Sequence, residues 1–348
     1  MADINIRTEG RAGRITLTRE KALNALTHEM ALAIEQALLD WQEDDAVELV
    51  LIDSAGDKAF CAGGDIVGLY RASKDENDHE TGRKFWRDEY RMNALIAGYP
   101  KPIVAMMQGY VMGGGVGIGG HAAHRVVCES SRVAMPEVGI GLIPDVGGSY
   151  RLAQAPGRVG EYLGLTAGQM NAADAIYAEF ADDFVPYERW DDLKTKLIET
   201  GDPAVISDFS AERPARTLPD EAWLETHFSG GDLKEILTSL EGDEEKPELA
   251  ERTVEKIRSM SPLSLASTLS LVREGRTGCI RDALRREYRF TSRAQEHGDF
   301  DEGVRAKLVD KDGAPRWSHD RPEAVTEDEV NAMLAAPDDG ELELPEVS

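Results

Sequence analysis

The sequence has few cysteines and no long apolar run. Three cysteines occur in 348 residues, far apart and without a CxxC pair, so a disulfide scaffold is excluded and a reducing compartment is favoured. No segment approaches the 18 consecutive apolar residues that cross a bilayer, and the first residues resemble neither a signal peptide nor a transit segment. We therefore expect a cytoplasmic protein with no membrane partner.

Basic residues are also scarce. The chain carries 39 Lys and Arg against 65 Asp and Glu, a formal net charge of −26. Nucleic-acid binders normally have a basic excess, because counterion release supplies much of their affinity, so we expect no nucleic-acid partner. A small anionic ligand must be met locally, by backbone amides or by a few cations. With 41% hydrophobic residues, the composition is that of a globular protein.

Short apolar runs alternate with glycine-rich turns in the first half of the chain. Alternating apolar residues predict a hairpin over 4–17, followed by an amphipathic helix capped by Thr27. Buried strands are predicted over 48–56 and 103–111, and each runs into glycines. A charged helix is predicted over 70–98, ended by two prolines. The unit of strand, glycine turn and helix therefore occurs twice.

The spacing of the apolar residues changes near residue 155. Two further apolar runs, RVVCES and SRVAMPEVGIG, complete a strand-rich core by about residue 150. Beyond it the apolar residues recur at three- and four-residue spacing, with breaks of Pro, Gly and Asp. These patterns predict an α/β core followed by a mainly helical half.

The glycine cluster at 113–120 admits three interpretations. Residues 115–120 match GxGxxG after a predicted strand, which a dinucleotide-binding fold requires. Glycines also occur where a helix and a strand simply pack closely. The third interpretation is an oxyanion site: the segment 60–65 also follows a strand and offers backbone amides, and two such turns can converge on one developing negative charge. No GK[ST] follows, which excludes a P-loop.

Two carboxylates stand in a stretch of otherwise apolar or glycine residues. Glu137 and Asp145 lie eight residues apart in MPEVGIGLIPDVGG. Burial raises the pKa of a carboxyl and destabilises the fold, so sites that tolerate it are often catalytic. A helix cap or loop position is the plainer alternative for either residue.

Other reactive side chains have plainer explanations. His121 and His124 have a spacing compatible with two metal ligands, but no third ligand is evident, so we predict no metal. Cys61 has no histidine placed by a motif to activate it and is expected to be a packing residue. Neither GxSxG nor HExxH occurs.

Taken together, these segments resemble the crotonase (enoyl-CoA hydratase/isomerase) superfamily. The resemblance lies in KALNAL (21–26), AFCAGGD (59–65), GYVMGGGVGI (109–118) and MPEVGIGLIPDVGG (135–148). FWRDEY (85–90), PDVGG, GGD in place of the commoner GAD, and DFDEGVRAKLVDKDGAPRW (299–317) resemble the branch that hydrolyses 3-hydroxyacyl-CoA thioesters. The resemblance spans nearly the whole chain.

The resemblance implies a fold and a set of roles. It implies a spiral core of repeated ββα units with the active site at 1–200, and a helical region at 201–348 that packs on it. Gly64 and Gly114 match the amide donors of the oxyanion hole. Glu137 matches the general base or nucleophile, and Asp145 the second acid. The residues implied to contact the substrate are Glu89, Lys21, Ala62 and Asp65.

One departure from the family pattern favours hydrolysis. Enoyl-CoA hydratases carry a second glutamate two residues after GGG, where this chain has Gly117. Loss of a general acid or base costs roughly 10²- to 10⁴-fold in rate, so a thioester hydrolase is favoured over an enoyl-CoA hydratase or isomerase. An NAD-dependent oxidoreductase is the second alternative. The resemblance further implies an acyl-CoA partner, no cofactor apart from the CoA of the substrate, and assembly into trimers or hexamers.

Overall fold

The chain opens with the predicted hairpin. In the computed structural model, which describes residues 3–337 and 340–345, strands β1 (Ile4–Glu9) and β2 (Ala12–Leu17) pair antiparallel. Helix α1 (His28–Gln42) follows, and the side chain of its N-cap Thr27 accepts a hydrogen bond from the Met30 amide. Hairpin and capped helix are both confirmed.

Four parallel strands extend the hairpin into a six-stranded sheet. They are β3 (Leu49–Ser54), β5 (Ile103–Met107), β7 (His124–Val127) and β9 (Asp183–Phe184), in the order β1-β2-β3-β5-β7-β9. Both faces of β3 are buried, as is usual in parallel sheets. The strand order never reverses, so the sheet lacks the switch point at which doubly wound folds bind dinucleotides. The dinucleotide-binding alternative is therefore wrong.

A second, three-stranded sheet runs beside the first. It consists of β4 (Ala59–Cys61), β6 (Tyr110–Met112) and β8 (Arg132–Ala134). The prediction of one strand over 103–111 is wrong, because the chain passes from one sheet to the other at Gly109. This glycine has φ +58°, and a Cβ here would lie 2.1 Å from the Lys58 carbonyl oxygen, so only glycine fits.

The two sheets produce a spiral. The same order occurs three times along the chain: a strand of the large sheet, a strand of the small sheet, and then a helical segment. This arrangement confirms the expected α/β class and ββα spiral. The helices of these turns are α2 (Ile66–Glu76), α3 (Glu80–Ala97), α4 (Gly114–Gly119) and α5 (Gly148–Gln154). The helix predicted over 70–98 is two helices, because α2 ends at Asn77 in the left-handed region.

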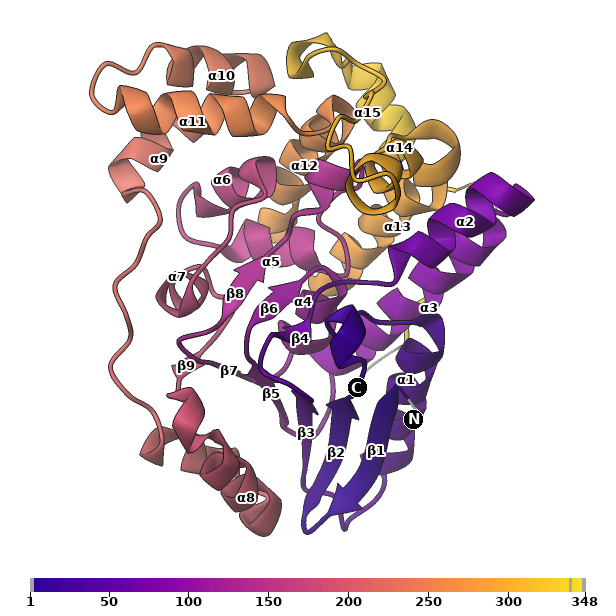
Figure 1. The fold of residues 1–348 in the computed structure, drawn as a ribbon, viewed down its shortest axis with the longest axis vertical. Coiled ribbons are helices and arrows are strands. Elements are labelled where there is room, and N and C mark those ends of the chain that lie inside the picture. The colour runs from indigo at the N-terminus through magenta and orange to yellow at the C-terminus, as the bar shows by residue number, and fades with distance from the viewer. Residues whose placement is uncertain (1–2, 338–339, 346–348) are drawn as a thin grey trace.

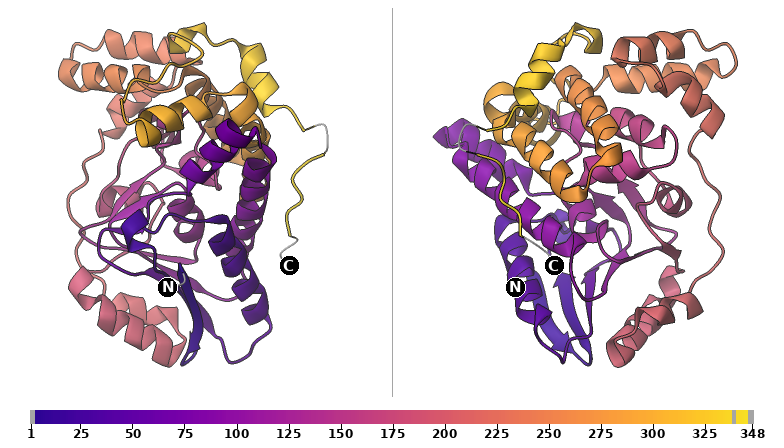
Figure 2. Two further views of the ribbon diagram at one scale, coloured as in Figure 1. Left: turned by 45° about the vertical axis from the view of Figure 1, so that its right-hand side comes forward. Right: turned by 180° about the vertical axis from the view of Figure 1, so that it is seen from behind.

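Helices dominate the second half, as predicted. They gather at one end of the molecule, whereas α8 lies at the other, and an irregular connection at 209–220 runs along the edge between them (Figures 1 and 2). α12 packs against α5 and α6, and α13 packs against α3. The division at residue 200 stays a prediction. The remaining helical elements are α6 (Val159–Thr166), α7 (Ala172–Tyr177), α8 (Trp190–Thr200), α9 (Glu221–Phe228), α10 (Leu233–Glu241), α11 (Pro247–Arg258), α12 (Pro262–Glu274), α13 (Ile280–His297), α14 (Phe300–Val304), α15 (Glu327–Leu334) and short turns, among them η2 (Glu137–Ile140), η4 (Pro203–Asp208) and a π turn at Arg305–Val309.

The large sheet carries a hydrophobic core on each face. On one face α8 and η4 cover Leu49, Leu51 and their neighbours. The other face packs into the main core, which extends through the second sheet to the C-terminal helices. Among the described residues, we find no helix that combines the length and apolar character needed to cross a bilayer.

Candidate active site

The two glycine turns meet between the small sheet and α4. The peptide nitrogen of Gly64 lies 3.3 Å from the position that a Cβ of Gly114 would occupy. Neither of the two N–H groups donates a hydrogen bond to any part of the chain that the structure describes. Two unpaired amide donors on adjoining turns are what an oxyanion hole requires.

Glu137 lies against the turn that precedes α4. It begins η2 and is 5% exposed. Its Oε1 lies 2.7 Å from where a Cβ of Gly113 would be, and Gly113 has φ +47°. Any side chain at position 113 would therefore strain the backbone and displace the glutamate.

Glu89 approaches the same turn from α3. Its Oε1 lies 2.9 Å from the Cβ position of Gly114, and the residue is 2% exposed. Within the described residues, Oε1 of Glu89 and Oε2 of Glu137 have no hydrogen-bond partner. Burial raises the pKa of both carboxyls well above the usual range, and the charge of Asp145 raises them further.

Asp145 is the third buried carboxylate. The Tyr90 hydroxyl donates a hydrogen bond to its Oδ2 at 2.7 Å. Burial raises the pKa of Asp145 to about 7, although the Tyr90 bond lowers it. Because like charges oppose one another's ionisation, the carboxyls of Glu89, Glu137 and Asp145 titrate as a group and not singly. Such groups suit acid and base chemistry.

The loop that carries Asp145 is held by His121. Val146 adopts φ +54°, which is unusual for a β-branched residue. Burial lowers the pKa of His121 to about 3, so the ring is neutral. Its Nε2 donates to the Val146 carbonyl oxygen at 2.7 Å, and Nδ1 accepts from Arg151 Nε at 3.3 Å. Because both ring nitrogens form hydrogen bonds, His121 orients the loop. In the described part of the chain, no three His, Cys, Asp or Glu side chains form a metal site.

The C-terminal half contributes Glu287 to this loop. This fully buried residue of α13 accepts hydrogen bonds from the Gly147 amide at 2.7 Å and from the amide and hydroxyl of Ser149. Burial raises the pKa of Glu287 to about 8, while these donors lower it. The loop after Asp145 is thus held by both halves of the chain.

Three predicted substrate contacts, Lys21, Ala62 and Asp65, are exposed or only partly buried. Lys21 is exposed and lines a surface pocket of about 260 Å³ together with Lys58. The Ala62 amide donates to the Leu23 carbonyl oxygen. Asp65 forms an ion pair with Arg19 at 2.9 Å. Their substrate contacts stay predictions.

The position of the missing hydratase glutamate is filled by other residues. A Cβ at Gly117 would lie 2.8 Å from Asn93 Nδ2 and 2.9 Å from Val146 Cβ. A larger side chain could enter only if these groups moved. Residues 115–120, considered above as a dinucleotide motif, lie in and directly after α4 rather than in a strand-to-helix turn.

Cys61 is a buried packing residue. Burial raises the pKa of its thiol to about 12, which keeps the nucleophilic thiolate form scarce.

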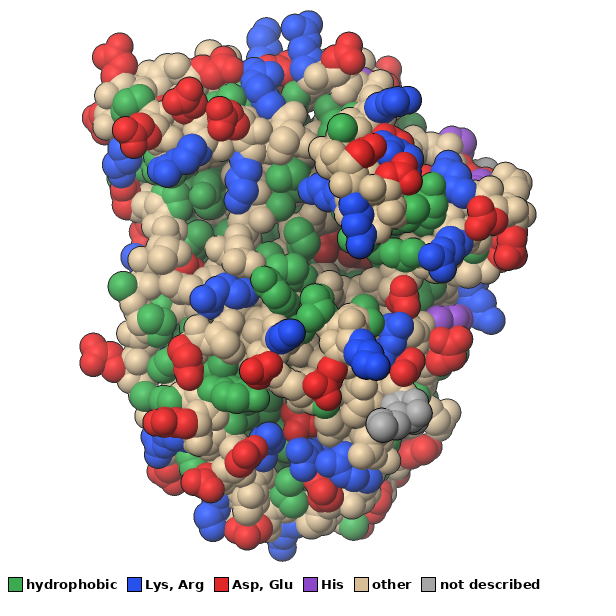
Figure 3. All heavy atoms as spheres, in the orientation of Figure 1, with side chains coloured by type: hydrophobic (Ala, Val, Ile, Leu, Met, Phe, Trp, Pro, Cys, Tyr) green, Lys and Arg blue, Asp and Glu red, His purple; other side chains and the backbone are tan. Residues whose placement is uncertain are grey.

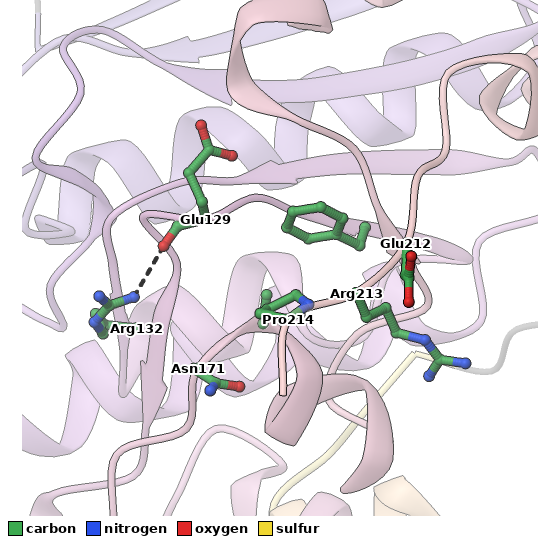
Figure 4. A pocket seen from close by; sticks show the side chains of 8 residues that line it. Glu129, Arg132, Asn171, Glu212, Arg213 and Pro214 are labelled. Carbon is green, nitrogen blue, oxygen red and sulfur yellow. Dashed lines mark hydrogen bonds between the residues drawn. The ribbon is translucent and has the colours of Figure 1, made fainter. Parts of the chain in front are cut away.

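The surface of the molecule carries a pocket away from the candidate site and a recess with acidic side chains. A pocket of about 520 Å³ beside the 209–220 connection is lined by eight residues that include none of the predicted site residues (Figure 4). There Arg132 donates to the Glu129 carbonyl oxygen at 3.2 Å. A recess with acidic side chains visible inside opens on the face shown in Figure 3.

Sequence reasoning missed four residues of this site. Tyr90 and Asn93 follow Glu89 on α3 by one and four residues, so helical spacing was a usable signal for Asn93. His121 was considered as a metal ligand, not as a loop clamp. Glu287 lies 140 residues beyond the loop it binds, and nothing local in the sequence links the two.

Fold and site together define a crotonase-type protein. The chain belongs to the enoyl-CoA hydratase/isomerase family, whose sequence model matches residues 12–334. Curated relatives of the chain carry a more specific name within this family. The mitochondrial 3-hydroxyisobutyryl-CoA hydrolase of Danio rerio is 37% identical over 347 residues, 96% of this chain and 90% of that protein. The enzyme of the same name from Homo sapiens is 36% identical over 343 residues, 94% of this chain and 87% of that protein.

Two solved structures are similar along the whole chain. An enoyl-CoA hydratase from Rhodobacter sphaeroides 2.4.1 is 48% identical with a TM-score of 0.90, covering 99% of this chain and 100% of that one. A carnitinyl-CoA dehydratase from Mycobacterium thermoresistibile is 39% identical with a TM-score of 0.92, covering 100% of this chain and 99% of that one.

Proposed function

We propose that the chain hydrolyses an acyl-CoA thioester, with 3-hydroxyisobutyryl-CoA as the preferred substrate. The observation that carries the proposal is the pair of unpaired amides at Gly64 and Gly114 beside Glu137, with glycine at position 117. The names of the curated relatives support the choice of substrate.

In this mechanism the thioester carbonyl oxygen accepts hydrogen bonds from the two glycine amides. These donors stabilise the negative charge that develops on the oxygen when the carbonyl carbon is attacked, and each is worth roughly 10²- to 10³-fold in rate. Their backbone position means that no titration can remove them.

Glu137 drives the attack by one of two routes. Its carboxylate adds to the carbonyl carbon, which expels CoA as a thiolate and leaves an anhydride that water then cleaves. Alternatively it takes a proton from a water molecule that attacks directly. Both routes consume one water and yield the free acid and the CoA thiol.

Asp145 exchanges protons during the reaction, and Glu89 contacts the substrate. Burial raises the pKa of Asp145 to about 7, and the residue has a fixed partner in Tyr90, so it can exchange a proton at physiological pH. Glu89, beside Gly114, is placed to contact the substrate near the oxyanion donors.

Hydration of an enoyl-CoA is the second candidate. It is favoured by the Rhodobacter sphaeroides structure, described as an enoyl-CoA hydratase and 48% identical to this chain. Against it stands Gly117, because water addition then lacks its second glutamate and the space is taken by Asn93.

The proposal extends to the setting of the enzyme. The reaction belongs to valine breakdown, needs no cofactor beyond the CoA of the substrate, and takes place in the cytoplasm in a trimer or hexamer. The vertebrate relatives are mitochondrial, and the cysteine pattern suits either reducing compartment.

A thiol-release panel tests the function. Purified protein is given 3-hydroxyisobutyryl-, 3-hydroxypropionyl-, acetyl- and crotonyl-CoA, and free CoA is measured with a disulfide reagent. The expected result is fastest release from 3-hydroxyisobutyryl-CoA. Loss of crotonyl-CoA absorbance without free thiol would instead identify a hydratase.

A further inference from the structure

Asn93 is a buried amide without partners. It is 0% exposed, and it is the one residue of the described chain whose two side-chain polar atoms are both buried without a hydrogen-bond partner. An amide can donate two hydrogen bonds and accept two. Leaving such a group unsatisfied destabilises the fold, so a buried amide of this kind calls for an explanation, and a ligand that completes its hydrogen bonds is one.

The neighbours of Asn93 place it in the active site. Phe85, Glu89 and Asn93 recur every four residues along α3 and therefore share one face of that helix. Each faces a glycine: Phe85 lies 3.3 Å from the Cβ position of Gly64, Glu89 lies 2.9 Å from that of Gly114, and Asn93 lies 2.8 Å from that of Gly117. The first two glycines are the proposed oxyanion donors, and the third is the vacated hydratase position.

We propose that Asn93 determines specificity by hydrogen-bonding the hydroxyl on the third carbon of the acyl group. This inference rests on the proposed function, because the thioester carbonyl must lie between Gly64 and Gly114. Gly117 is three residues along α4 from Gly114, about 4.5 Å at 1.5 Å per residue. In this proposal the acyl group runs along α4 from Gly114 toward Gly117, so that a substituent two carbons from the carbonyl meets the amide.

The chemistry of the amide matches a hydroxyl. The carboxamide oxygen accepts the hydroxyl proton, and the NH₂ group donates to the hydroxyl oxygen, so both unpaired atoms of Asn93 are satisfied together. An acyl group without the hydroxyl leaves both atoms unpaired. Sites built around a substrate hydroxyl discriminate strongly against analogues that lack it. Asp145 is then left free for proton transfer.

Asn93→Leu is the test variant, because leucine has a similar size and no polar atoms. Ser267→Ala is the matched control, since Ser267 is buried on α12 with an unpartnered hydroxyl of its own. Each protein is assayed for thiol release from 3-hydroxyisobutyryl-CoA and from isobutyryl-CoA, which lacks the hydroxyl. Binding of both thioesters is measured by calorimetry, and the thermal midpoint is recorded.

Three results support the proposal together. In Asn93→Leu the ratio of kcat/KM for the hydroxylated over the plain substrate falls by about 10- to 100-fold, most of this change is a loss for 3-hydroxyisobutyryl-CoA, and the thermal midpoint is unchanged or higher because an unsatisfied amide has been removed. Ser267→Ala keeps the wild-type ratio.

An unchanged ratio, or an equal loss for both substrates with a lower thermal midpoint, would overturn the proposal by assigning Asn93 a structural role. If the wild-type protein releases no thiol, the proposed function fails, and the binding data then test the role of Asn93 on their own. Selective binding of the hydroxylated thioester that Asn93→Leu abolishes supports the role of Asn93. Binding that does not discriminate, or discrimination that survives the substitution, overturns it.

Discussion

At the residue scale, the site is a group of buried carboxyls in a protein whose surface is strongly acidic. Glu89, Glu137, Asp145 and Glu287 are each at most 5% exposed, and burial raises the pKa of all four. Holding such groups costs stability, which is typical of functional sites. The raised pKa values make these four carboxyls the natural candidates for proton exchange in this chain.

Glu137→Gln tests the proposed base or nucleophile. Glutamine has nearly the same shape, so the fold is expected to be kept, but the amide can neither attack the carbonyl nor take a proton from water. We expect kcat for thiol release to fall at least about 10³-fold. Glu341→Gln, which alters an ion pair with Arg289 on the surface, serves as control. Retained turnover in Glu137→Gln would remove this residue from the mechanism.

Asp145→Asn tests the titration of the cluster. The pKa of Asp145 is about 7 in the folded protein against an ordinary value of 3.8, so the folded state binds this proton more tightly than the unfolded chain. Its contribution to stability is present at low pH and is lost as pH rises from about 4 to about 7. The difference corresponds to at most roughly 4 kcal/mol.

The asparagine variant lacks this proton. Compared with wild type, it should gain stability at pH 8 and little or none at pH 4, as measured by urea unfolding at both values. A gain of the same size at both pH values would mean that Asp145 is ionised in the folded protein throughout this range.

At the element scale, the sequence predicted the strands and helices more reliably than their junctions. The hairpin, α1 and β3 follow from periodicity and capping. The division of 103–111 between two sheets does not, because it depends on a close contact between Gly109 and the Lys58 carbonyl oxygen. Likewise, Glu137 was visible as a lone acid among apolar residues, whereas Glu287 acquires its role only when α13 packs on the core.

Glu287→Gln tests whether α13 holds the catalytic loop. Its carboxyl accepts from the amides of Gly147 and Ser149, and a glutamine would turn an NH₂ group toward one of these donors. We expect the free energy of unfolding to fall by about 1–3 kcal/mol and kcat to fall as Asp145 shifts. Glu341→Gln, at the exposed end of the Arg289 ion pair, should cost no more than about 1 kcal/mol. Equal stabilities in the two variants would show that the loop holds without α13.

At the scale of the whole molecule, the net charge of the protein has the same sign as the charge of the proposed substrate, so the two repel one another. The protein carries a formal −26, and CoA carries several negative phosphate oxygens. The oxyanion donors that we propose are uncharged amides, so they add no long-range attraction. The summed field of the surface therefore acts on the approach of the substrate, while the chemistry after binding is shielded from it.

This opposition predicts how the reaction depends on salt. At 0.01 M ionic strength the Debye length is about 30 Å, and at 0.15 M it is about 8 Å, so added salt screens the repulsion. We expect KM for the CoA thioester to fall several-fold between these conditions while kcat stays constant. The matching pantetheine thioester, which lacks the nucleotide and its phosphates, should keep a constant KM. A KM that rises with salt for the CoA substrate alone would mean that local cations outweigh the global charge. Lys21, exposed and predicted to contact the substrate, would then be the first residue to replace, because its loss should restore the fall of KM with salt.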